Sequence, residues 1–213
     1  MDVNQKIAET GIVPVVVIEE AAKAIPLAGA LKAGGIEIME ITFRTEAAAD
    51  SISNIREKHP EVLVGAGTIL DLEQCKKALD YGAQYIVSPG FDRCVAEYCL
   101  TKTIPIFPGC VTPSEIMTAL KLNLQILKYF PADVYGGLKG MKALSGPFPQ
   151  ISFIPTGGVN IHNLYEYLSA PYVFAVGGSW LCDKRDINSG NFDRITALCK
   201  EAIALRDGNI CES

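Results

Sequence analysis

The sequence predicts a (β/α)₈ barrel, the TIM-barrel fold, with residues 1–213 in a single domain. The first reason is size, because 213 residues with 49% hydrophobic side chains are ample for the core of one α/β barrel. The second reason is that short apolar runs alternate with helical segments, as they do in the β-α units of a parallel sheet. The third is the number of units, since eight strands with eight following helices close such a barrel.

Each expected strand is a short apolar run, and each is followed by a longer segment with a helical pattern, beginning with an alanine-rich one. In chain order the expected strands are 12–18, 36–42, 62–68, 85–88, 104–108, 125–130, 151–156 and 172–176. The helices expected after them are 20–33, 46–58, 72–81, 94–101, 113–122, 138–145, 160–169 and 192–205.

The alternative architecture is an open, doubly wound sheet. That fold normally has fewer units and a glycine-rich dinucleotide fingerprint after the first strand. Here Ile18, Glu19 and Glu20 follow the first strand, with no glycine among them. We also find no linker, low-complexity segment or longer repeat at which a second domain would begin.

Charge and hydropathy exclude several classes of partner. The formal net charge is −5, and dense basic clusters are limited to short pairs such as Lys76-Lys77, which argues against nucleic-acid binding. Residues 1–11 are typical of the lead-in to an ordinary helix and not of a signal peptide. Apolar stretches stay well short of the roughly 20 residues that a membrane span needs. We therefore expect a cytoplasmic protein with no membrane contact.

The cysteines and histidines argue against a metal site. With only His59 and His162, a histidine-rich site cannot form. The seven cysteines are scattered, odd in number and free of any Cys-x-x-Cys pair, so we expect neither a disulfide framework nor a zinc knuckle, and most of them should pack as small apolar side chains. They are Cys75, Cys94, Cys99, Cys110, Cys182, Cys199 and Cys211.

Lys128 is the first candidate for chemistry because it interrupts the apolar run 126–130, which reads as a buried strand. Lysine is rarely buried without a partner or a function. Desolvation disfavours the ammonium form and makes the neutral amine available to attack a carbonyl carbon and form a Schiff base. The alternative is a lysine that extends its head to water at the edge of the sheet.

A second group of polar residues ends strand two. With a period of two, Glu40, Thr42 and Arg44 share one side, as Lys128 and Phe130 do on strand six. If that side is the barrel interior, a glutamate that moves protons and an arginine that grips a carboxylate face Lys128. The positive charge of the arginine would also favour a neutral lysine. The alternative is a structural ion pair at the barrel rim.

Other strand ends are rich in glycine. The Gly65-Ala-Gly-Thr68 segment should leave room for a ligand, whereas 88–90 and 108–110 are equally compatible with plain turns. Paired glycines, Gly157-Gly158 and Gly177-Gly178, follow strands seven and eight, where barrels commonly bind phosphate through backbone N–H groups. Two tight strand-to-helix turns are the alternative.

Taken together, these motifs resemble the family of 2-keto-3-deoxy-6-phosphogluconate aldolases, also called 4-hydroxy-2-oxoglutarate aldolases. The resemblance runs from about Ile12 to the C-terminal helix. It rests on Glu40-Ile-Thr-Phe-Arg44-Thr, Gly65-Ala-Gly-Thr68, Ser88-Pro-Gly90, Lys128-Tyr-Phe-Pro-Ala132, Pro155-Thr-Gly-Gly158 and Gly177-Gly-Ser-Trp180.

The resemblance implies a homotrimeric class I aldolase that acts on a small 2-keto acid sugar phosphate and needs no metal or other cofactor. Lys128 would be the Schiff-base lysine and Glu40 the general acid/base. The pyruvyl carboxylate would contact Arg44 and Thr68. The remaining implied positions are Pro89 and Phe130, which shape the pocket, Thr156 beside the phosphate, and Gly157, Gly158, Gly178 and Ser179, which bind the phosphate.

Three departures leave the reactive groups in place. The family often has phenylalanine at Tyr129, glutamate at Asp133 and serine at Asn160. Three other functions stay open at this stage: an aldolase for the galactonate epimer, a metal-dependent aldolase, and a non-catalytic barrel that binds a sugar phosphate.

Overall fold

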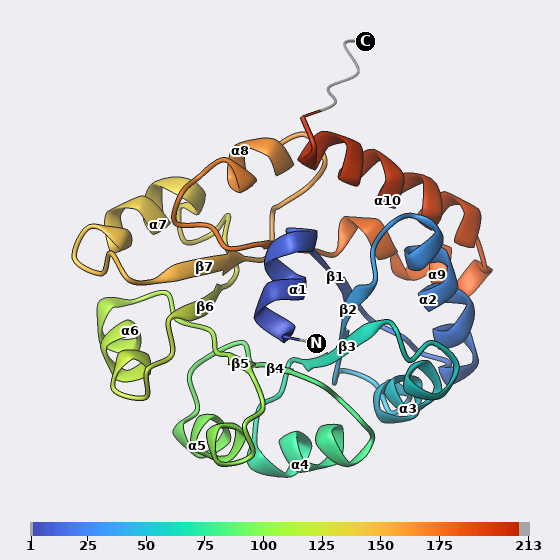
Figure 1. The fold of residues 1–213 in the computed structure, drawn as a ribbon, viewed down its shortest axis with the longest axis horizontal. Coiled ribbons are helices and arrows are strands. Elements are labelled where there is room, and N and C mark those ends of the chain that lie inside the picture. The colour runs from blue at the N-terminus through green and yellow to red at the C-terminus, as the bar shows by residue number, and fades with distance from the viewer. Residues whose placement is uncertain (1, 209–213) are drawn as a thin grey trace.

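Parallel strands form a closed barrel in the middle of the molecule, and helices surround it (Figure 1). The structure is a computed structural model and describes residues 2–208. Six strands are hydrogen-bonded in the order β5-β4-β3-β2-β1-β8, and β6 pairs with β7. The strands are β1 (Ile12–Val16), β2 (Ile38–Thr42), β3 (Leu63–Gly67), β4 (Ile86–Val87), β5 (Ile106–Phe107), β6 (Ile126–Tyr129), β7 (Ser152–Pro155) and β8 (Val176–Gly178).

Isolated parallel bridges connect the two sheets. Gly109 pairs with Lys128 on one side of the β6-β7 pair, and Phe153 and Thr156 pair with Val173 and Gly177 on the other. The described residues therefore form a closed barrel with alternating helices, which confirms the fold class.

A helix follows every strand, as the sequence predicts, and several helices begin at residues whose side chains cap the first backbone N–H groups. The side chains of Asp71 and Asp92 cap two helices, and Thr112 with Glu115 forms a capping box around Pro113. The eight helices are α2 (Ala24–Ala33), α3 (Ala48–Lys58), α4 (Leu72–Asp80), α5 (Arg93–Thr101), α6 (Pro113–Leu120), α7 (Gly137–Ser145), α8 (Leu164–Leu168) and α10 (Phe192–Arg206). The shorter elements are η1 (Ala21–Lys23), η2 (Trp180–Cys182) and α9 (Lys184–Ser189).

The eighth strand lies later in the chain than the sequence suggested. The segment expected there, 172–176, pairs with β7 through the single bridge between Phe153 and Val173. The strand itself is Val176–Gly178, because those residues pair in register with β1 and close the barrel. Gly177 and Gly178 therefore lie within the last strand, whereas we had placed them after it.

The first helix, α1 (Val3–Thr10), covers the N-terminal end of the barrel, and Figure 1 shows it over the middle of the strands. Its Ile7 is buried and lines the same interior space as residues of β2 and β6. Lys6 forms a salt bridge of 2.8 Å with Glu37, just before β2. The N-terminal segment, from which the sequence predicts an ordinary helix, thus forms α1 and closes the bottom of the barrel.

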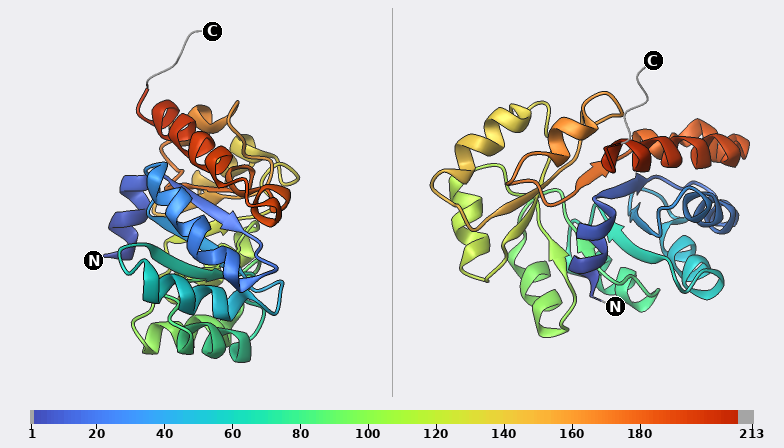
Figure 2. Two further views of the ribbon diagram at one scale, coloured as in Figure 1. Left: turned by 90° about the vertical axis from the view of Figure 1, so that its right-hand side faces the viewer. Right: turned by 45° about the horizontal axis from the view of Figure 1, so that its top comes forward.

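Five cysteines, Cys75, Cys99, Cys110, Cys182 and Cys199, are buried, as expected of small apolar side chains, while Cys94 is exposed. Cys211 lies outside the described residues. Two further views show the long α10 lying along one side of the barrel (Figure 2). No helix within residues 2–208 has the length and hydropathy of a membrane span.

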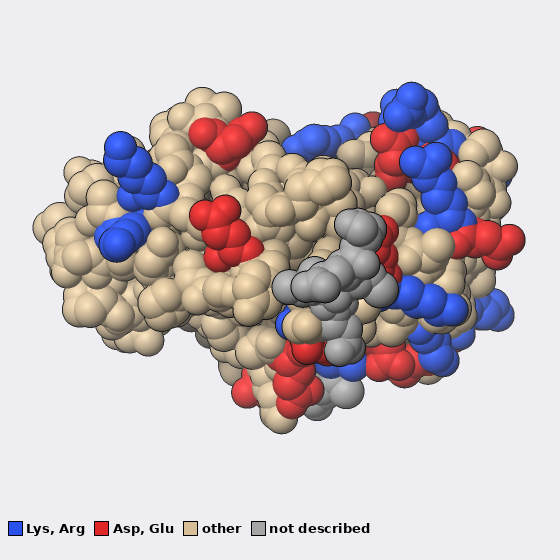
Figure 3. Space-filling model, turned by 90° about the horizontal axis from the view of Figure 1, so that it is seen from above, with Lys and Arg blue, Asp and Glu red and all other residues tan. Residues whose placement is uncertain are grey.

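Charges of both signs are mixed on the surface. On the face shown in Figure 3, Lys and Arg side chains are interspersed with Asp and Glu. Among the described residues drawn there, basic side chains form no continuous surface, in agreement with the net charge of −5.

Candidate active site

Lys128 and Glu40 meet inside the barrel. The Nζ atom of Lys128 lies 3.2 Å from Oε1 of Glu40, and the two residues are 5% and 3% exposed. The two come from β6 and β2, which are not neighbours in the sheet order, so the contact crosses the barrel interior. The parity argument that turned both side chains inward is confirmed, and Lys128 does not extend to water as a surface lysine would.

A small cavity of about 10 Å³ adjoins this pair, enough for about one water molecule. Of the nine side chains that line it, Glu40 carries the only carboxylate and Lys128 the only amine. The others are Ile7, Val13, Tyr85, Val87, Phe107, Ile154 and Thr156. A largely apolar shell of this kind keeps bulk water away and strengthens the interaction between the two charged groups.

Tyr85 and Thr156 add hydroxyl groups of different character. The Tyr85 hydroxyl donates to the Met39 carbonyl at 2.8 Å, and burial, together with the nearby Glu40 carboxylate, raises its pKa well above the ordinary value. Tyr85 is therefore a neutral, already engaged group. The Thr156 hydroxyl is buried and has no hydrogen-bond partner among residues 2–208, so it can bind a group that enters the site.

The small residues on β3 make room for protein side chains. A Cβ atom at Gly67 would lie 2.5 Å from Cγ and Cδ of Glu40, and one at Gly65 would lie 2.5 Å from the Tyr85 ring. We expected this segment to leave room for a ligand. The structure instead shows that Glu40 and Tyr85 occupy the space, because a glycine is the only residue that lets them approach so closely.

Three further candidates lie toward the C-terminal ends of the strands. The Phe130 ring centre is 5.4 Å from Nζ of Lys128. Nε of the exposed Arg44 donates to the Thr68 hydroxyl at 3.2 Å, and Thr68 has a φ of 56°, in the left-handed region. Arg44 lies beyond the end of β2, so the exposed guanidinium and the hydroxyl form a polar pair at the rim while the lysine lies deeper.

The four phosphate candidates lie on two neighbouring strand ends. The bridge between Thr156 and Gly177 places Gly157 and Gly158 beside Gly178 and Ser179. Gly158 and Ser179 are exposed, and the φ angles of Gly157 and Gly158 are 91° and 77°, values that other residues rarely adopt.

Pro89 follows β4, and its carbonyl lies close to Gly109, the residue that pairs with Lys128. It also lines a hollow of about 300 Å³ with residues that follow β3 and β4. The Ser88 hydroxyl donates to the Gly90 carbonyl at 2.7 Å, which is the plain turn chemistry that we had left open for this segment.

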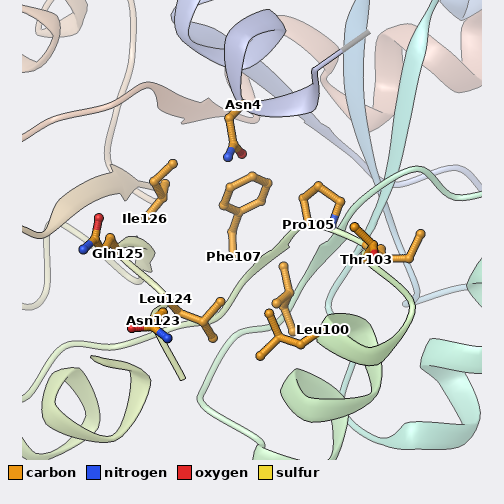
Figure 4. A pocket seen from close by; sticks show the side chains of 11 residues that line it. Asn4, Leu100, Thr103, Pro105, Phe107, Asn123, Leu124, Gln125 and Ile126 are labelled. Atoms are coloured by element: carbon orange, nitrogen blue, oxygen red, sulfur yellow. The ribbon is translucent and has the colours of Figure 1, made fainter. Parts of the chain in front are cut away.

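A larger cleft, of about 410 Å³, opens at the opposite end of the barrel (Figure 4). It lies between Asn4 of α1 and the segments that lead into β5 and β6, with the Phe107 ring between them. Because it is at the N-terminal ends of the strands and contains neither Lys128 nor Glu40, we do not assign the chemistry to it.

A primary amine beside a carboxylate in a dry, enclosed setting is suited to imine chemistry. A proton that moves along the 3.2 Å contact converts an ammonium and a carboxylate into a neutral nucleophile and an acid. Among residues 2–208, no three His, Cys, Asp or Glu side chains gather as ligands for a metal ion.

Sequence reasoning named three of the nine residues that line the small interior cavity and missed the other six, of which Tyr85 and Ile7 show the reasons. Tyr85 and Val87 have the same parity on strand four, a signal that would have turned Tyr85 inward. Ile7 was not detectable in this way, because its place depends on how a helix outside the eight units packs against the barrel.

Comparison with known proteins identifies the family. A family model described as KDPG and KHG aldolase matches residues 3–198. A 2-dehydro-3-deoxy-phosphogluconate aldolase of Treponema pallidum is 44% identical, with 91% of this chain and 92% of that protein covered. A KHG/KDPG aldolase of Escherichia coli K12 is 42% identical, with 93% and 94% covered.

A solved structure agrees. The KDPG aldolase of Legionella pneumophila, with pyruvate captured at low pH as a covalent carbinolamine, is 39% identical and has a TM-score of 0.91 over 95% of this chain and 98% of that one. The resemblance inferred from the motifs is thereby confirmed: this chain belongs to the KDPG and KHG aldolase family.

Proposed function

We propose that this protein is a class I aldolase. It reversibly cleaves 2-keto-3-deoxy-6-phosphogluconate to pyruvate and glyceraldehyde 3-phosphate, and it also accepts 4-hydroxy-2-oxoglutarate, which gives pyruvate and glyoxylate. The observation that carries this proposal is the buried contact of 3.2 Å between Nζ of Lys128 and Oε1 of Glu40. The names of the family and of its relatives support the choice of substrates.

Lys128 is the nucleophile. Its neutral amine attacks the C2 ketone to form a carbinolamine, and Glu40, protonated by the transfer described above, gives a proton to the departing hydroxyl so that water leaves. The product is a protonated imine at C2. Its positive charge makes it an electron sink for the bond between C3 and C4.

Cleavage follows when Glu40, or a water molecule that it holds, removes the proton of the C4 hydroxyl. The electrons of the O–H bond form the aldehyde C=O of glyceraldehyde 3-phosphate, and those of the C3–C4 bond form an enamine. The enamine takes up a proton at C3, and hydrolysis then releases pyruvate and restores the free lysine.

The remaining candidates bind and orient the substrate. Arg44 and Thr68, already paired at 3.2 Å, hold the carboxylate of the pyruvyl part. Phe130 covers the lysine, Thr156 offers its unpartnered hydroxyl and Pro89 shapes the approach. The phosphate binds to backbone N–H groups at Gly157, Gly158 and Gly178 and to the Ser179 hydroxyl.

The test of the lysine is chemical trapping. Incubation with pyruvate and borohydride should add one reduced pyruvyl group to the intact protein, and the addition should disappear in Lys128→Ala but persist in Lys139→Ala, an exposed lysine on α7. If the protein gains no mass, or if Lys128→Ala still gains it, the assignment is wrong. Cleavage of 2-keto-3-deoxy-6-phosphogluconate in the presence of EDTA tests the metal-dependent alternative, which requires that this cleavage stop.

Four points stay predictions. Preference for the gluconate over the galactonate epimer is measured by comparing cleavage of the two, and a barrel that binds a sugar phosphate without catalysis would cleave neither. The homotrimer follows from the family resemblance and is measured by sedimentation. The cytoplasmic location and the extent of one catalytic domain over residues 1–213 are likewise predictions from the sequence.

A further inference from the structure

Tyr129 makes a contact that no step of the mechanism uses. It directly follows Lys128 on β6, so its side chain lies on the opposite, outer face of the strand. The residue is 2% exposed, and its ring packs edge to face on Phe153 at 5.5 Å and on Tyr135 at 6.4 Å between ring centres. The hydroxyl donates a hydrogen bond of 2.6 Å to the carbonyl of Tyr135.

The hydroxyl fits this place closely and stays a donor. Burial raises the pKa of Tyr129, so the O–H keeps its proton across the neutral range. A Cβ atom at Gly140 on α7 would lie 2.5 Å from the Tyr129 hydroxyl oxygen. The surrounding backbone is thus shaped around the hydroxyl as well as the ring.

The carbonyl that Tyr129 holds belongs to the turn 130–136, which joins β6 to α7 and lies against the candidate phosphate site. Within the turn, the N–H of Ala132 donates to the carbonyl of Thr156 at 2.8 Å, and the N–H of Asp133 donates to that of Gly157 at 3.3 Å. A Cβ atom at Gly158 would lie 2.5 Å from Cβ of Asp133. The turn is therefore the support behind the backbone at Gly157 and Gly158.

We propose that Tyr129 is a positioning residue for the phosphate group of the substrate. Its hydroxyl fixes the turn 130–136 to β6, the strand of the Schiff-base lysine, through the hydrogen bond to the Tyr135 carbonyl. The turn then holds the Gly157-Gly158 backbone in the shape that binds phosphate. This inference rests on the phosphate site of the proposed function.

The experiment compares Tyr129→Phe with Tyr172→Phe. The control is matched, because the Tyr172 hydroxyl likewise donates to a backbone carbonyl, that of Leu138 at 3.1 Å, which lies in α7 and outside the turn. Loss of one such hydrogen bond should raise the KM of Tyr129→Phe for 2-keto-3-deoxy-6-phosphogluconate about 2- to 10-fold. Its kcat, and both constants for the unphosphorylated 4-hydroxy-2-oxoglutarate, should stay within about 2-fold of wild type.

Hydrogen exchange gives a readout that does not need turnover. In Tyr129→Phe the amides of Ala132, Asp133 and Gly137 should exchange faster, and inorganic phosphate should bind more weakly than to Tyr172→Phe. Unchanged exchange, or equal changes in KM for both substrates, would overturn the positioning role. A wild type that forms no pyruvate adduct would instead refute the proposed function, and the exchange and phosphate measurements would still decide for or against the role of Tyr129.

Discussion

Replacing Gly67 with alanine should disable the enzyme through Glu40 alone. The added Cβ would lie 2.5 Å from both Cγ and Cδ of Glu40, whereas carbon atoms in contact are normally about 3.5–4.0 Å apart. The Glu40 side chain must therefore move by about 1 Å or more, away from its contact with Nζ of Lys128. Misplacement of a catalytic group by about 1 Å can cost on the order of 100-fold in rate, so we expect kcat to fall by roughly that factor.

The fold should survive the substitution, since overpacking of this kind costs about 1–3 kcal/mol. The matched control is Gly29→Ala on α2, where the new Cβ would lie 4.0 Å from the His59 ring, an ordinary contact. That control should keep wild-type kcat and gain about 0.5–1 kcal/mol in the free energy of unfolding, because alanine is a better helix former than glycine.

A double-mutant cycle isolates the mechanism. In Glu40→Ala the space next to Gly67 is vacant, so adding Gly67→Ala should reduce the single-turnover cleavage rate by less than about 3-fold further. If Gly67→Ala alone keeps near-wild-type kcat, or if its effect is as large in the Glu40→Ala background, then the glycine does not act by positioning Glu40 and the reasoning is refuted.

Two further substitutions test the binding groups. Thr156→Val removes a buried hydroxyl that has no partner among the described residues, so the free energy of unfolding should stay equal or rise while kcat/KM falls about 2- to 10-fold. The control is Thr42→Val, which breaks a hydrogen bond of 2.8 Å to the Val16 carbonyl and should instead lower the free energy of unfolding by about 1 kcal/mol. Thermal unfolding and steady-state kinetics measure both, and a large loss of stability in Thr156→Val would contradict the free hydroxyl. Ser179→Asp places a negative charge at an exposed strand end and should raise KM for the phosphorylated substrate far more than for 4-hydroxy-2-oxoglutarate, by like-charge repulsion. Equal increases for both substrates would argue against a phosphate site there.

The parts of the fold that the sequence predicts are those set by local pattern. The alternation of apolar runs with helical segments identifies the eight units, and the period of two is enough to turn Glu40 and Lys128 toward each other. The boundaries of the last strand depend on pairing with β1, a contact between the two ends of the chain that no local pattern contains. The same holds for Ile7, whose position beneath the lysine results from tertiary packing of α1.

Glycine motifs illustrate the limit more sharply. Gly65 and Gly67 mark a close approach, and sequence alone cannot tell whether a ligand or a protein side chain comes near. The structure shows that protein side chains come near, Tyr85 at Gly65 and Glu40 at Gly67. A glycine-rich strand end in a barrel therefore indicates that another group lies close to the backbone. Only the structure shows whether that group is a catalytic side chain, as Glu40 is proposed to be.

Four polar groups of the site form two pairs, and these pairs bear on how a 2-keto acid would bind. Lys128 contacts Glu40 in the interior, and Arg44 contacts Thr68 at the rim. In the proposed binding mode the carboxylate and the ketone are on adjacent carbons of the substrate, so the ketone would reach inward to the buried Lys128 while the carboxylate stays at the exposed Arg44. This proposed mode would place the end that becomes pyruvate between β2 and β6, and the rest of the substrate would extend toward other strand ends. We expect a phosphate at the far end of the substrate to bind at Gly157, Gly158, Gly178 and Ser179, because the bridge between Thr156 and Gly177 brings these residues together at two neighbouring strand ends.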